Sequence, residues 1–205
     1  MDCFNIMEGT SLVRIFHAAP NAPAVDVYVD GAVVAQNLVF TEITDYMPVP
    51  VGDHMVDVYA AGTKENPVIA VVLTVPDRKI LTAAATGNLD DLKLIVLEDD
   101  SQNGVTEGKS TVRAVHLSPN APGVDITAND MQFAKDLMFR EMTDYVVVPP
   151  GTYRINVTAT GSKDSVLMFN IRLEDNTISS VYVCGDLPNL EPIHVLDGGT
   201  YLCKK

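Results

Sequence analysis

The residues best suited to chemistry occur in a motif that the chain carries twice. The pattern His-x-x-Pro-Asn-Ala-Pro-x-Val-Asp occupies residues 17–26 and again residues 116–125. An imidazole and a carboxylate in one short segment can serve as an acid–base pair or as metal ligands. The motif therefore raises two functional hypotheses, catalysis and metal binding, which the surrounding sequence has to support.

The strand that leads into the motif favours a structural role for the histidine. Alternation places His17 on the same face as Ile15, and His116 follows the same pattern. A histidine at the end of an apolar stripe is expected to be buried and hydrogen-bonded within its own domain. A zinc site would need a third ligand in both copies, and none recurs, since His54 aligns with Tyr153. We therefore predict no metal, no cofactor and no catalytic residue.

A second duplicated segment, Thr-Asp-Tyr, occupies residues 44–46 and 143–145. Asp45 shares the parity of the apolar Ile43, so we expect it to be partly buried. A buried carboxylate must be hydrogen-bonded, here to loop amides or to the first histidine of the motif. Tyr46 is expected to anchor a corner of the fold through its hydroxyl group.

An arginine precedes each histidine motif by three residues. Arg14 and Asp26 fall on the polar faces of their strands, as do Arg113 and Asp125. If the two strands are antiparallel neighbours, these residues form cross-strand ion pairs worth roughly 0.2–1 kcal/mol each. The candidate site residues, for which a structural role is favoured over a functional one, are His17, Asn21, Asp26, Asp45, Tyr46, His116, Asn120, Asp125, Asp144 and Tyr145.

The repeat covers nearly the whole chain. Its offset is 99 residues at the histidine motif (116 − 17 = 99) and 98 at a later glycine (185 − 87 = 98). A period near 100 suits a whole domain and is too long for a solenoid unit. A polar, glycine-bearing segment separates the copies. The expected layout is a first domain at 10–98, a linker at 99–110, a second domain at 111–197 and an exposed C-terminal extension at 198–205.

Strand signals dominate both copies. Residues 25–30 alternate between apolar and polar side chains and end in Asp30-Gly31, a strong hairpin signal. The second copy has Asn129-Asp130 there, which predicts an altered hairpin. About seven or eight short strands per copy and no capped helical period predict an all-β fold. We expect two tandem antiparallel β-sandwich domains.

Composition narrows the function further. The net charge of −13 disfavours a nucleic-acid partner, because an acidic surface repels phosphates. No apolar run is long enough to span a bilayer. The acidic pairs at 90–91 and 99–100 are expected to be solvated loop residues, without the oxygen spacing of a calcium loop. Nucleophile-elbow, phosphate-loop and dinucleotide fingerprints are absent from the sequence.

The three cysteines stand outside the repeated pattern. Cys184 lies in an apolar run and is expected to be a small buried hydrophobe. A bridge between Cys184 and Cys203, an intermolecular bond through Cys3 or Cys203, and three free thiols all remain open. No export signal precedes the first domain, which by sequence alone indicates the cytoplasm.

Three blocks in a fixed order resemble the DUF4397 family of bacterial and archaeal domains. They are Arg-x-x-His-x-x-Pro-Asn-Ala-Pro-x-Val-Asp, then Val27-Tyr28-Val29-Asp30-Gly31, then Tyr46-x-x-Val49-Pro50-x-Gly52. The resemblance implies all-β, immunoglobulin-like or transthyretin-like antiparallel β-sandwich domains, often in tandem on secreted or cell-envelope proteins. It brings no catalytic residues.

We therefore expect a non-catalytic structural or binding module, associated with the bacterial cell envelope or spore surface, with an unknown protein or glycan partner. The alternative is a small-ligand or carbohydrate-binding protein that uses loop residues such as Asn21 in the duplicated motif. The absence of Trp and an aromatic content of 6% disfavour carbohydrate binding. We expect no pocket that unites His17, Asp26 and Asp45. The largest concave surface should lie at loop tips or between the domains.

Overall fold

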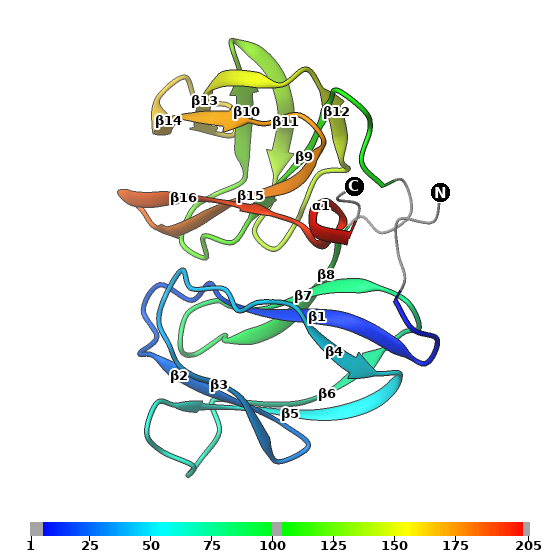
Figure 1. Ribbon diagram of the computed structural model, residues 1–205. Coiled ribbons are helices and arrows are strands. Elements are labelled where there is room, and N and C mark those ends of the chain that lie inside the picture. The colour runs from blue at the N-terminus through cyan, green and yellow to red at the C-terminus, as the bar shows by residue number, and fades with distance from the viewer. Residues whose placement is uncertain (1–5, 100–103, 203–205) are drawn as a thin grey trace. The chain divides into compact units, whose positions relative to one another are not determined.

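The computed structural model describes residues 6–99 and 104–202, which form two compact units divided at residues 101 and 102. We call them the first and second domain and describe each by itself. Each is built almost entirely from strands (Figure 1). The predicted all-β fold is confirmed.

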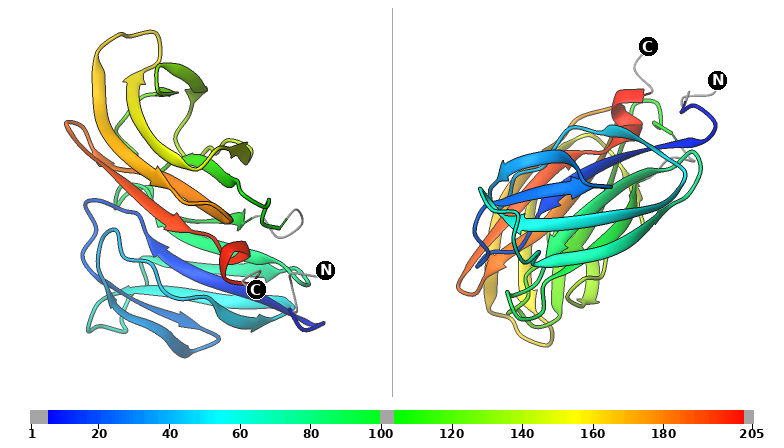
Figure 2. Two further views of the ribbon diagram at one scale, coloured as in Figure 1. Left: turned by 45° about the horizontal axis from the view of Figure 1, so that its top comes forward. Right: turned by 90° about the horizontal axis from the view of Figure 1, so that it is seen from below.

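Eight strands form two four-stranded sheets in the first domain. The strand order is β4-β1-β7-β8 in one sheet and β3-β2-β5-β6 in the other. Figure 2 shows them as two layers, and its right-hand view looks onto the second sheet. The strands are β1 (Thr10–His17), β2 (Val25–Val29), β3 (Ala32–Leu38), β4 (Met47–Pro50), β5 (Gly52–Ala60), β6 (Ile69–Val75), β7 (Ile80–Thr86) and β8 (Lys93–Asp99).

The second domain repeats this topology. Its sheets have the orders β12-β9-β15-β16 and β11-β10-β13-β14, which match the first domain strand for strand. The elements are β9 (Ser110–His116), β10 (Val124–Ala128), β11 (Met131–Leu137), β12 (Val146–Val148), β13 (Gly151–Ala159), β14 (Ser165–Leu173), β15 (Thr177–Asp186), β16 (Asn189–Leu196) and the short helix α1 (Gly198–Leu202).

The core of each domain fills the space between its two sheets. In the first domain Ile15 from one sheet packs among Val27 and Val58 from the other. Alternation along β2 and β5 directs these apolar side chains inward, and each buried Val or Ile contributes about 1.5–3 kcal/mol. The equivalent cluster of the second domain includes Ala114, Ile126 and Val157.

One strand pair in each domain departs from the expected antiparallel pattern. β1 runs parallel to β7, with Leu12 opposite Ile80, and β9 runs parallel to β15. The remaining pairs are antiparallel. A parallel pair needs a long crossover, which the strands of the opposite sheet supply here. After β1 the chain crosses to the other sheet to form β2 and β3. It later returns to the sheet of β1 to form β7.

The second hairpin is not altered, contrary to the sequence-based expectation. Asp30 and Gly31 have φ of 50° and 80°, and Asn129 and Asp130 have φ of 48° and 66°. Two consecutive left-handed residues define the type I′ turn that suits a two-residue hairpin. Asn and Asp tolerate this region better than other non-glycine residues, so the turn survives the loss of its glycine.

Two expected boundaries are wrong. Asp99 is the last residue of β8 and fully buried, and Ser110 is the first residue of β9, so neither belongs to the linker. The C-terminal segment is not an exposed extension along its described part. Thr200 in α1 is buried, and its hydroxyl group accepts a hydrogen bond from the Ile178 amide and donates one to the Ile178 carbonyl, both at 2.7 Å.

Among residues 6–99 and 104–202, no helix is long and apolar enough to cross a membrane. Cys3 and Cys203, whose pairing the sequence left open, lie outside the described residues. Cys184 is a free thiol and fully buried, and burial raises its pKa. It therefore packs as the small hydrophobe that its sequence neighbourhood indicated.

The hairpins generate a reciprocal prediction. Asp130→Gly should stabilise the second domain by up to about 1 kcal/mol, because glycine adopts a positive φ without strain and the exposed ion pair of Asp130 with Arg154, which it removes, contributes little. Gly31→Asp should destabilise the first domain by a similar amount. Urea denaturation of both variants, followed by circular dichroism, measures the two shifts. Shifts of the same sign would contradict the assigned turn geometry.

Candidate functional site

The histidines of the duplicated motif are engaged by their own loops. His17 is 1% exposed; its Nε2 lies 3.0 Å from the Pro23 carbonyl, and its Nδ1 accepts a hydrogen bond of 3.3 Å from the Ala19 amide. The carbonyl can only accept and the amide can only donate, so the ring is neutral with its proton on Nε2. Burial lowers the pKa of His17, which favours the same neutral form.

His116 repeats this arrangement in the second domain. Its Nε2 lies 3.1 Å from the Pro122 carbonyl, and its Nδ1 accepts from the Ser118 amide at 3.3 Å. Burial also lowers the pKa of His116. In each domain the imidazole closes the loop that carries the Pro-Asn-Ala-Pro sequence. Both ring nitrogens are committed to that role, which leaves neither for a metal ion or a substrate.

The expected pairing of Arg14 with Asp26 is wrong, as is that of Arg113 with Asp125. Strands β1 and β2 belong to different sheets, and so do β9 and β10. Asp26 accepts hydrogen bonds from the amides of Asn37 at 2.7 Å and Gly62 at 2.9 Å, which lower its pKa. These bonds hold the bulged end of β3 and the loop after β5.

Asp125 takes the same place in the second domain, where it accepts from the Asp136 amide at 2.8 Å. Asn37 and Asp136 have φ of 51° and 50°. The carboxylate therefore fixes a left-handed residue near the end of the neighbouring strand in both copies. Asn21 and Asn120 are exposed on the same loops as the histidines.

The duplicated Thr-Asp-Tyr segment divides its residues between different tasks. Thr44 exchanges hydrogen bonds with the backbone of Ile15, and Thr143 does so with Ala114. Asp45 and Asp144 are exposed, contrary to the predicted partial burial. They follow an isolated β-bridge rather than lying in a regular strand, so parity does not apply to them. Nothing in the structure explains why these two aspartates recur.

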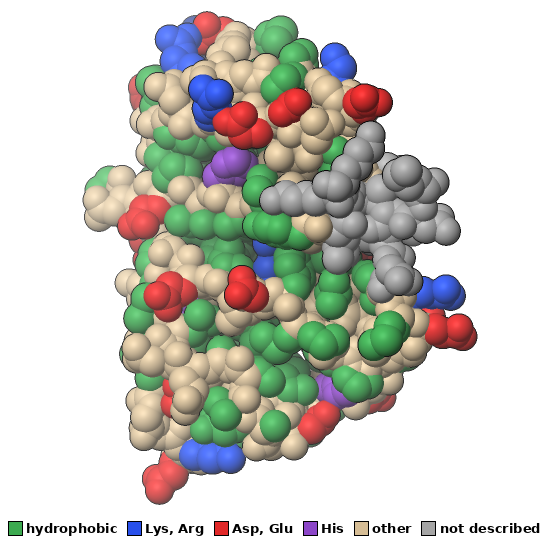
Figure 3. Space-filling view, viewed as in Figure 1, with side chains coloured by type: hydrophobic (Ala, Val, Ile, Leu, Met, Phe, Trp, Pro, Cys, Tyr) green, Lys and Arg blue, Asp and Glu red, His purple; other side chains and the backbone are tan. Residues whose placement is uncertain are grey.

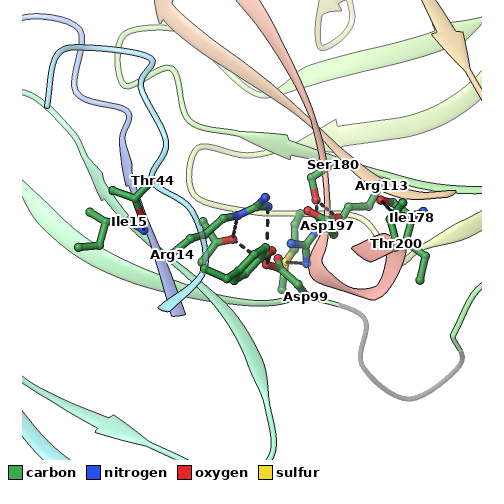
Figure 4. Close-up of polar contacts among 12 residues, drawn as sticks. Arg14, Ile15, Thr44, Asp99, Arg113, Ile178, Ser180, Asp197 and Thr200 are labelled. Atoms are coloured by element: carbon green, nitrogen blue, oxygen red, sulfur yellow. Dashed lines mark hydrogen bonds and ion pairs between the residues drawn. The ribbon is translucent and has the colours of Figure 1, made fainter. Parts of the chain in front are cut away.

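The tyrosines of this segment belong to a polar network that sequence reasoning did not assemble. In the first domain Arg14 donates from Nε to the Thr82 hydroxyl at 2.8 Å, and Thr82 donates to Asp99 at 2.7 Å (Figure 4). Asp99 also accepts from the Tyr46 hydroxyl and lies 3.6 Å from Arg14 Nη2. The guanidinium carbon lies 4.7 Å from the centroid of the Tyr46 ring.

The second domain has the same network. Arg113 donates to the Ser180 hydroxyl at 2.8 Å, Ser180 donates to Asp197 at 2.7 Å, and the Tyr145 hydroxyl donates to Asp197 at 2.6 Å. Arg113 lies 4.6 Å over the Tyr145 ring. Asp99 is the last residue of the edge strand β8, and Asp197 directly follows the edge strand β16. Each tyrosine directly precedes the strand at the other edge of its sheet.

This network was detectable in principle. Thr82 and Ser180 lie 98 residues apart, as do Asp99 and Asp197, the same offset as the later glycine pair. We predicted that Asp99 is a solvated loop residue, because an acidic pair before a glycine-bearing segment is typical of a linker. Its burial and its contacts with Tyr46, Thr82 and Arg14 make it a structural acceptor instead.

Small apolar cavities lie inside both sandwiches. The first domain holds one of about 40 Å³ and the second one of about 60 Å³, each lined by core side chains from both sheets. The first cavity is lined by His17 and His54 but by neither Asp26 nor Asp45. The prediction of no pocket uniting the three duplicated residues holds for these cavities. Both cavities lie between the two sheets of a domain and are lined by core residues.

The outward face of the β3-β2-β5-β6 sheet differs between the domains. In the first domain it bears an exposed apolar group whose members are cross-strand neighbours: Tyr28 lies opposite Val33, and Met55 lies opposite Val72. Val33, Met55 and Val72 are 47%, 46% and 57% exposed. We call Tyr28, Val33, Met55, Tyr59, Ala70 and Val72 the apolar face.

Two aromatic rings shape this face. Tyr28 and Tyr59 meet edge to face, with ring centroids 5.6 Å apart and planes at 90°. The Lys64 ammonium lies 4.2 Å over the Tyr28 ring. Asp57 of β5 lies on the same face, opposite Tyr28 on β2 and opposite Ala70 on β6. Hydrophobic side chains also reach the surface on the side of this domain seen in Figure 3, with acidic side chains between them.

The equivalent face of the second domain is more polar, and its exposed apolar side chain is Met168, which is 59% exposed and lies where the first domain has Ala70. Strand registers place Thr127 where the first domain has Tyr28, Arg154 where it has Met55, and Asn170 where it has Val72. Gln132, Asn156 and Thr158 replace Val33, Asp57 and Tyr59. The scaffold is thus duplicated and its outward face is not. An unduplicated apolar surface on a duplicated framework is a candidate binding site.

His54 borders this face and has no histidine counterpart. Its Nδ1 lies 2.7 Å from an Asp30 carboxylate oxygen, and its Nε2 lies 2.8 Å from the Pro50 carbonyl. Both partners are acceptors, so the doubly protonated ring satisfies both; chiefly the hydrogen bond with Asp30 raises the pKa of His54. In the second domain the Tyr153 hydroxyl donates to the Pro149 carbonyl at 2.7 Å.

Within the described parts of the chain, no group of three or more His, Cys, Asp or Glu side chains could hold a metal ion.

Comparison with protein-family models identifies the family of this chain. The model described as "Domain of unknown function (DUF4397)" matches residues 11–127 and 110–200. The chain belongs to the DUF4397 family. The two matches agree with the tandem pair of domains and with the resemblance carried by the duplicated motif. No curated protein matches the sequence.

Two solved structures are similar to this DUF4397 chain at low identity. One is a family CBM26 module of Amy13K from Eubacterium rectale, in complex with maltoheptaose, at 8% identity and a TM-score of 0.30, covering 93% of this chain and 99% of that one. The other is a leucine-rich repeat protein from Bacteroides thetaiotaomicron, at 15% identity and a TM-score of 0.21, covering 89% and 26%. Neither likeness carries an argument about this protein.

The polar network generates a stability prediction. Tyr46→Phe and Tyr145→Phe should each lower the free energy of unfolding by about 1–3 kcal/mol, because a buried aspartate loses a hydrogen-bond donor. Tyr28→Phe, on the outward face, is the matched control and should change stability by less than about 0.5 kcal/mol. Urea denaturation measures all three. Equal effects at Tyr46 and Tyr28 would show that the network contributes nothing.

His54 generates a pH prediction. Its folded-state pKa lies above the ordinary 6.5, so its contacts stabilise fully below about pH 6.5 and lose this contribution as pH rises through the folded-state pKa. The stability lost in His54→Gln should therefore be larger at about pH 5.5 than at about pH 8.5, as urea denaturation can measure. Tyr153→Phe is the control and should show no such pH dependence, and a pH-independent loss for His54→Gln would refute the charged contact.

Proposed function

We propose that this DUF4397 chain is a non-catalytic binding module whose binding surface is the apolar face of the first domain. The observation that carries the proposal is the contrast between the two copies. Residues that recur hold the framework together. On the outward face, Val33, Met55 and Val72 of the first domain are exposed and apolar, whereas Gln132, Arg154 and Asn170 stand at the same positions of the second domain. A binding surface is expected at exposed positions whose side chains the fold does not require.

The absence of catalysis is part of the proposal. Catalytic groups usually gather in a cleft and act on one another. Here each duplicated histidine has both nitrogens occupied by backbone groups, and Asp26 accepts two backbone amides. The duplicated aspartates that are exposed, Asp45 and Asp144, lie in loops away from these groups in sequence. The hydrogen bonds of the histidines and of Asp26 to backbone groups support a structural role for these residues rather than a catalytic one.

The character of the face favours a polypeptide partner over a glycan. Sugars are usually held on flat aromatic surfaces with polar groups nearby, whereas Tyr28 and Tyr59 meet at right angles. Val33, Met55 and Val72 offer aliphatic surface of the kind that protein partners cover. The family resemblance further suggests that the module acts at the cell envelope or spore surface, which fractionation of the producing cells would test.

A peptide selection tests the proposed surface. A random dodecapeptide library displayed on phage is selected on the immobilised whole chain, and enriched peptides are measured by fluorescence anisotropy. The variant Val33→Gln/Met55→Arg/Val72→Asn places the second domain's residues on the first domain's face and should weaken binding at least about tenfold, or 1.4 kcal/mol. Gln132→Val on the second domain is the control and should bind unchanged.

Two results would contradict the proposal. Binding that survives the triple substitution would place the site elsewhere, provided circular dichroism shows the fold intact. Turnover in a broad screen of ester, glycoside and peptide substrates, abolished by His17→Gln with the fold intact, would show that the protein is an enzyme. Binding on a glycan array but to no peptide would favour the carbohydrate alternative.

A further inference from the structure

The edge strands of the four sheets differ in the features that block the addition of a further strand. An edge strand carries a row of backbone donors and acceptors without a neighbouring strand, and proteins block such edges with charges, prolines, bulges or short length. Across residues 6–99 and 104–202, the edge strands are β3, β4, β6 and β8 in the first domain and β11, β12, β14 and β16 in the second. Each can be inspected for these devices.

Seven of the eight edges carry at least one. Prolines 48 and 50 lie in β4, and charged side chains lie in β8 and β16. Register shifts interrupt the pairing of β3 and of β11, and β12 has three residues. β14 has both a register shift against β13 and the charged Arg172. These features make addition of a further strand unfavourable.

β6 is the exception. Its sequence, Ile-Ala-Val-Val-Leu-Thr-Val, contains no charge and no proline, and its seven residues pair with β5 without a register shift. Ala70, Val71, Val72 and Thr74 are exposed. Pro67 and Pro76 flank the strand, which limits pairing to the residues between them. Val72 belongs both to this edge and to the apolar face.

We propose that β6 is a docking edge for an extended basic and apolar segment of another polypeptide, which adds to the sheet as a fifth strand. This inference rests on the proposed function and names its partner class. Backbone hydrogen bonds along β6 would supply affinity, and alternate side chains of the partner would lie over the apolar face. The second domain, with Asn170 and Arg172 at the equivalent edge, would not accept it.

Charge selects the partner's chemistry. Residues 1–102 carry 5 basic and 15 acidic side chains, a net charge of 5 − 15 = −10. Asp57 and Asp53 lie on β5, opposite Ala70 and Thr74 of β6. Neighbouring strands are about 4.8 Å apart, so a lysine or arginine of an added strand can reach over β6 toward these carboxylates. The same negative charge opposes pairing of β6 with a second copy of this chain.

Synthetic peptides test the proposal on the whole chain. The probe is a fluorescein-labelled decapeptide of five Lys-Val repeats; the controls are five Glu-Val repeats and a Lys-Val peptide N-methylated at alternate amides along one edge. We expect binding of the first peptide, at least about tenfold weaker binding of both controls, and weaker binding with added salt. Protection of β6 amides in hydrogen exchange should accompany binding.

Matched variants locate the site. Val72→Lys places a charge on the β6 edge and should weaken binding at least about tenfold, whereas Asn170→Lys at the equivalent position of β14 should leave it unchanged. Ala70→Lys provides a second variant if Val72→Lys disturbs the circular dichroism spectrum.

Each contrary result has a distinct meaning. Equal binding of the N-methylated or the Glu-Val peptide would overturn strand addition or charge selection, and the binding module would stand. Failure of the Lys-Val peptide while phage-selected peptides still bind the apolar face would likewise overturn this inference alone. A concentration-dependent dimer that Val72→Lys dissolves would assign the edge to a second copy. Failure of every peptide would overturn the proposed function as well.

Discussion

The buried arginine of each domain is the constraint on which the rest of the sandwich depends. A guanidinium cannot lose its charge, so Arg14 needs an acceptor wherever it is removed from water. The chain supplies Thr82 from the neighbouring strand, Asp99 from the strand beyond it, and the Tyr46 ring before the opposite edge strand. One side chain thus ties together every part of the β4-β1-β7-β8 sheet.

The same constraint explains which residues recur. Removal of one partner takes a hydrogen bond from a buried charge or hydroxyl group, and this loss costs more than the net gain from forming the contact. Arg113, Ser180, Asp197 and Tyr145 therefore repeat the arrangement, with only the hydroxyl residue exchanged from Thr to Ser. The histidine loops follow the same logic, because each imidazole satisfies two backbone groups that the loop would otherwise bury.

Divergence is concentrated where these constraints end. On the outward face of the β3-β2-β5-β6 sheet, the side chains of Tyr28, Met55 and Val72 belong neither to the polar network nor to the core clusters, so they can change without loss of fold. Substitution of Thr127, Arg154 and Asn170 for Tyr28, Met55 and Val72 leaves the strand order intact. The exposed valines of β6 do not belong to the core clusters. An edge strand without charges, prolines or bulges carries a risk of aggregation. A partner that covers the edge would account for that feature.

The sequence by itself determined the duplication, the all-β class, the strand positions and the burial of the motif histidines. These are local properties, expressed in alternation, turn residues and the spacing of the repeat. Only the tertiary structure decided which strands become neighbours. In the structure Arg14 pairs with Asp99 and not with Asp26, β1 runs parallel to β7, and the ring of Tyr28 contacts that of Tyr59. Pairing partners are separated by tens of residues, and alternation records which face a side chain occupies without recording which strand lies across from it.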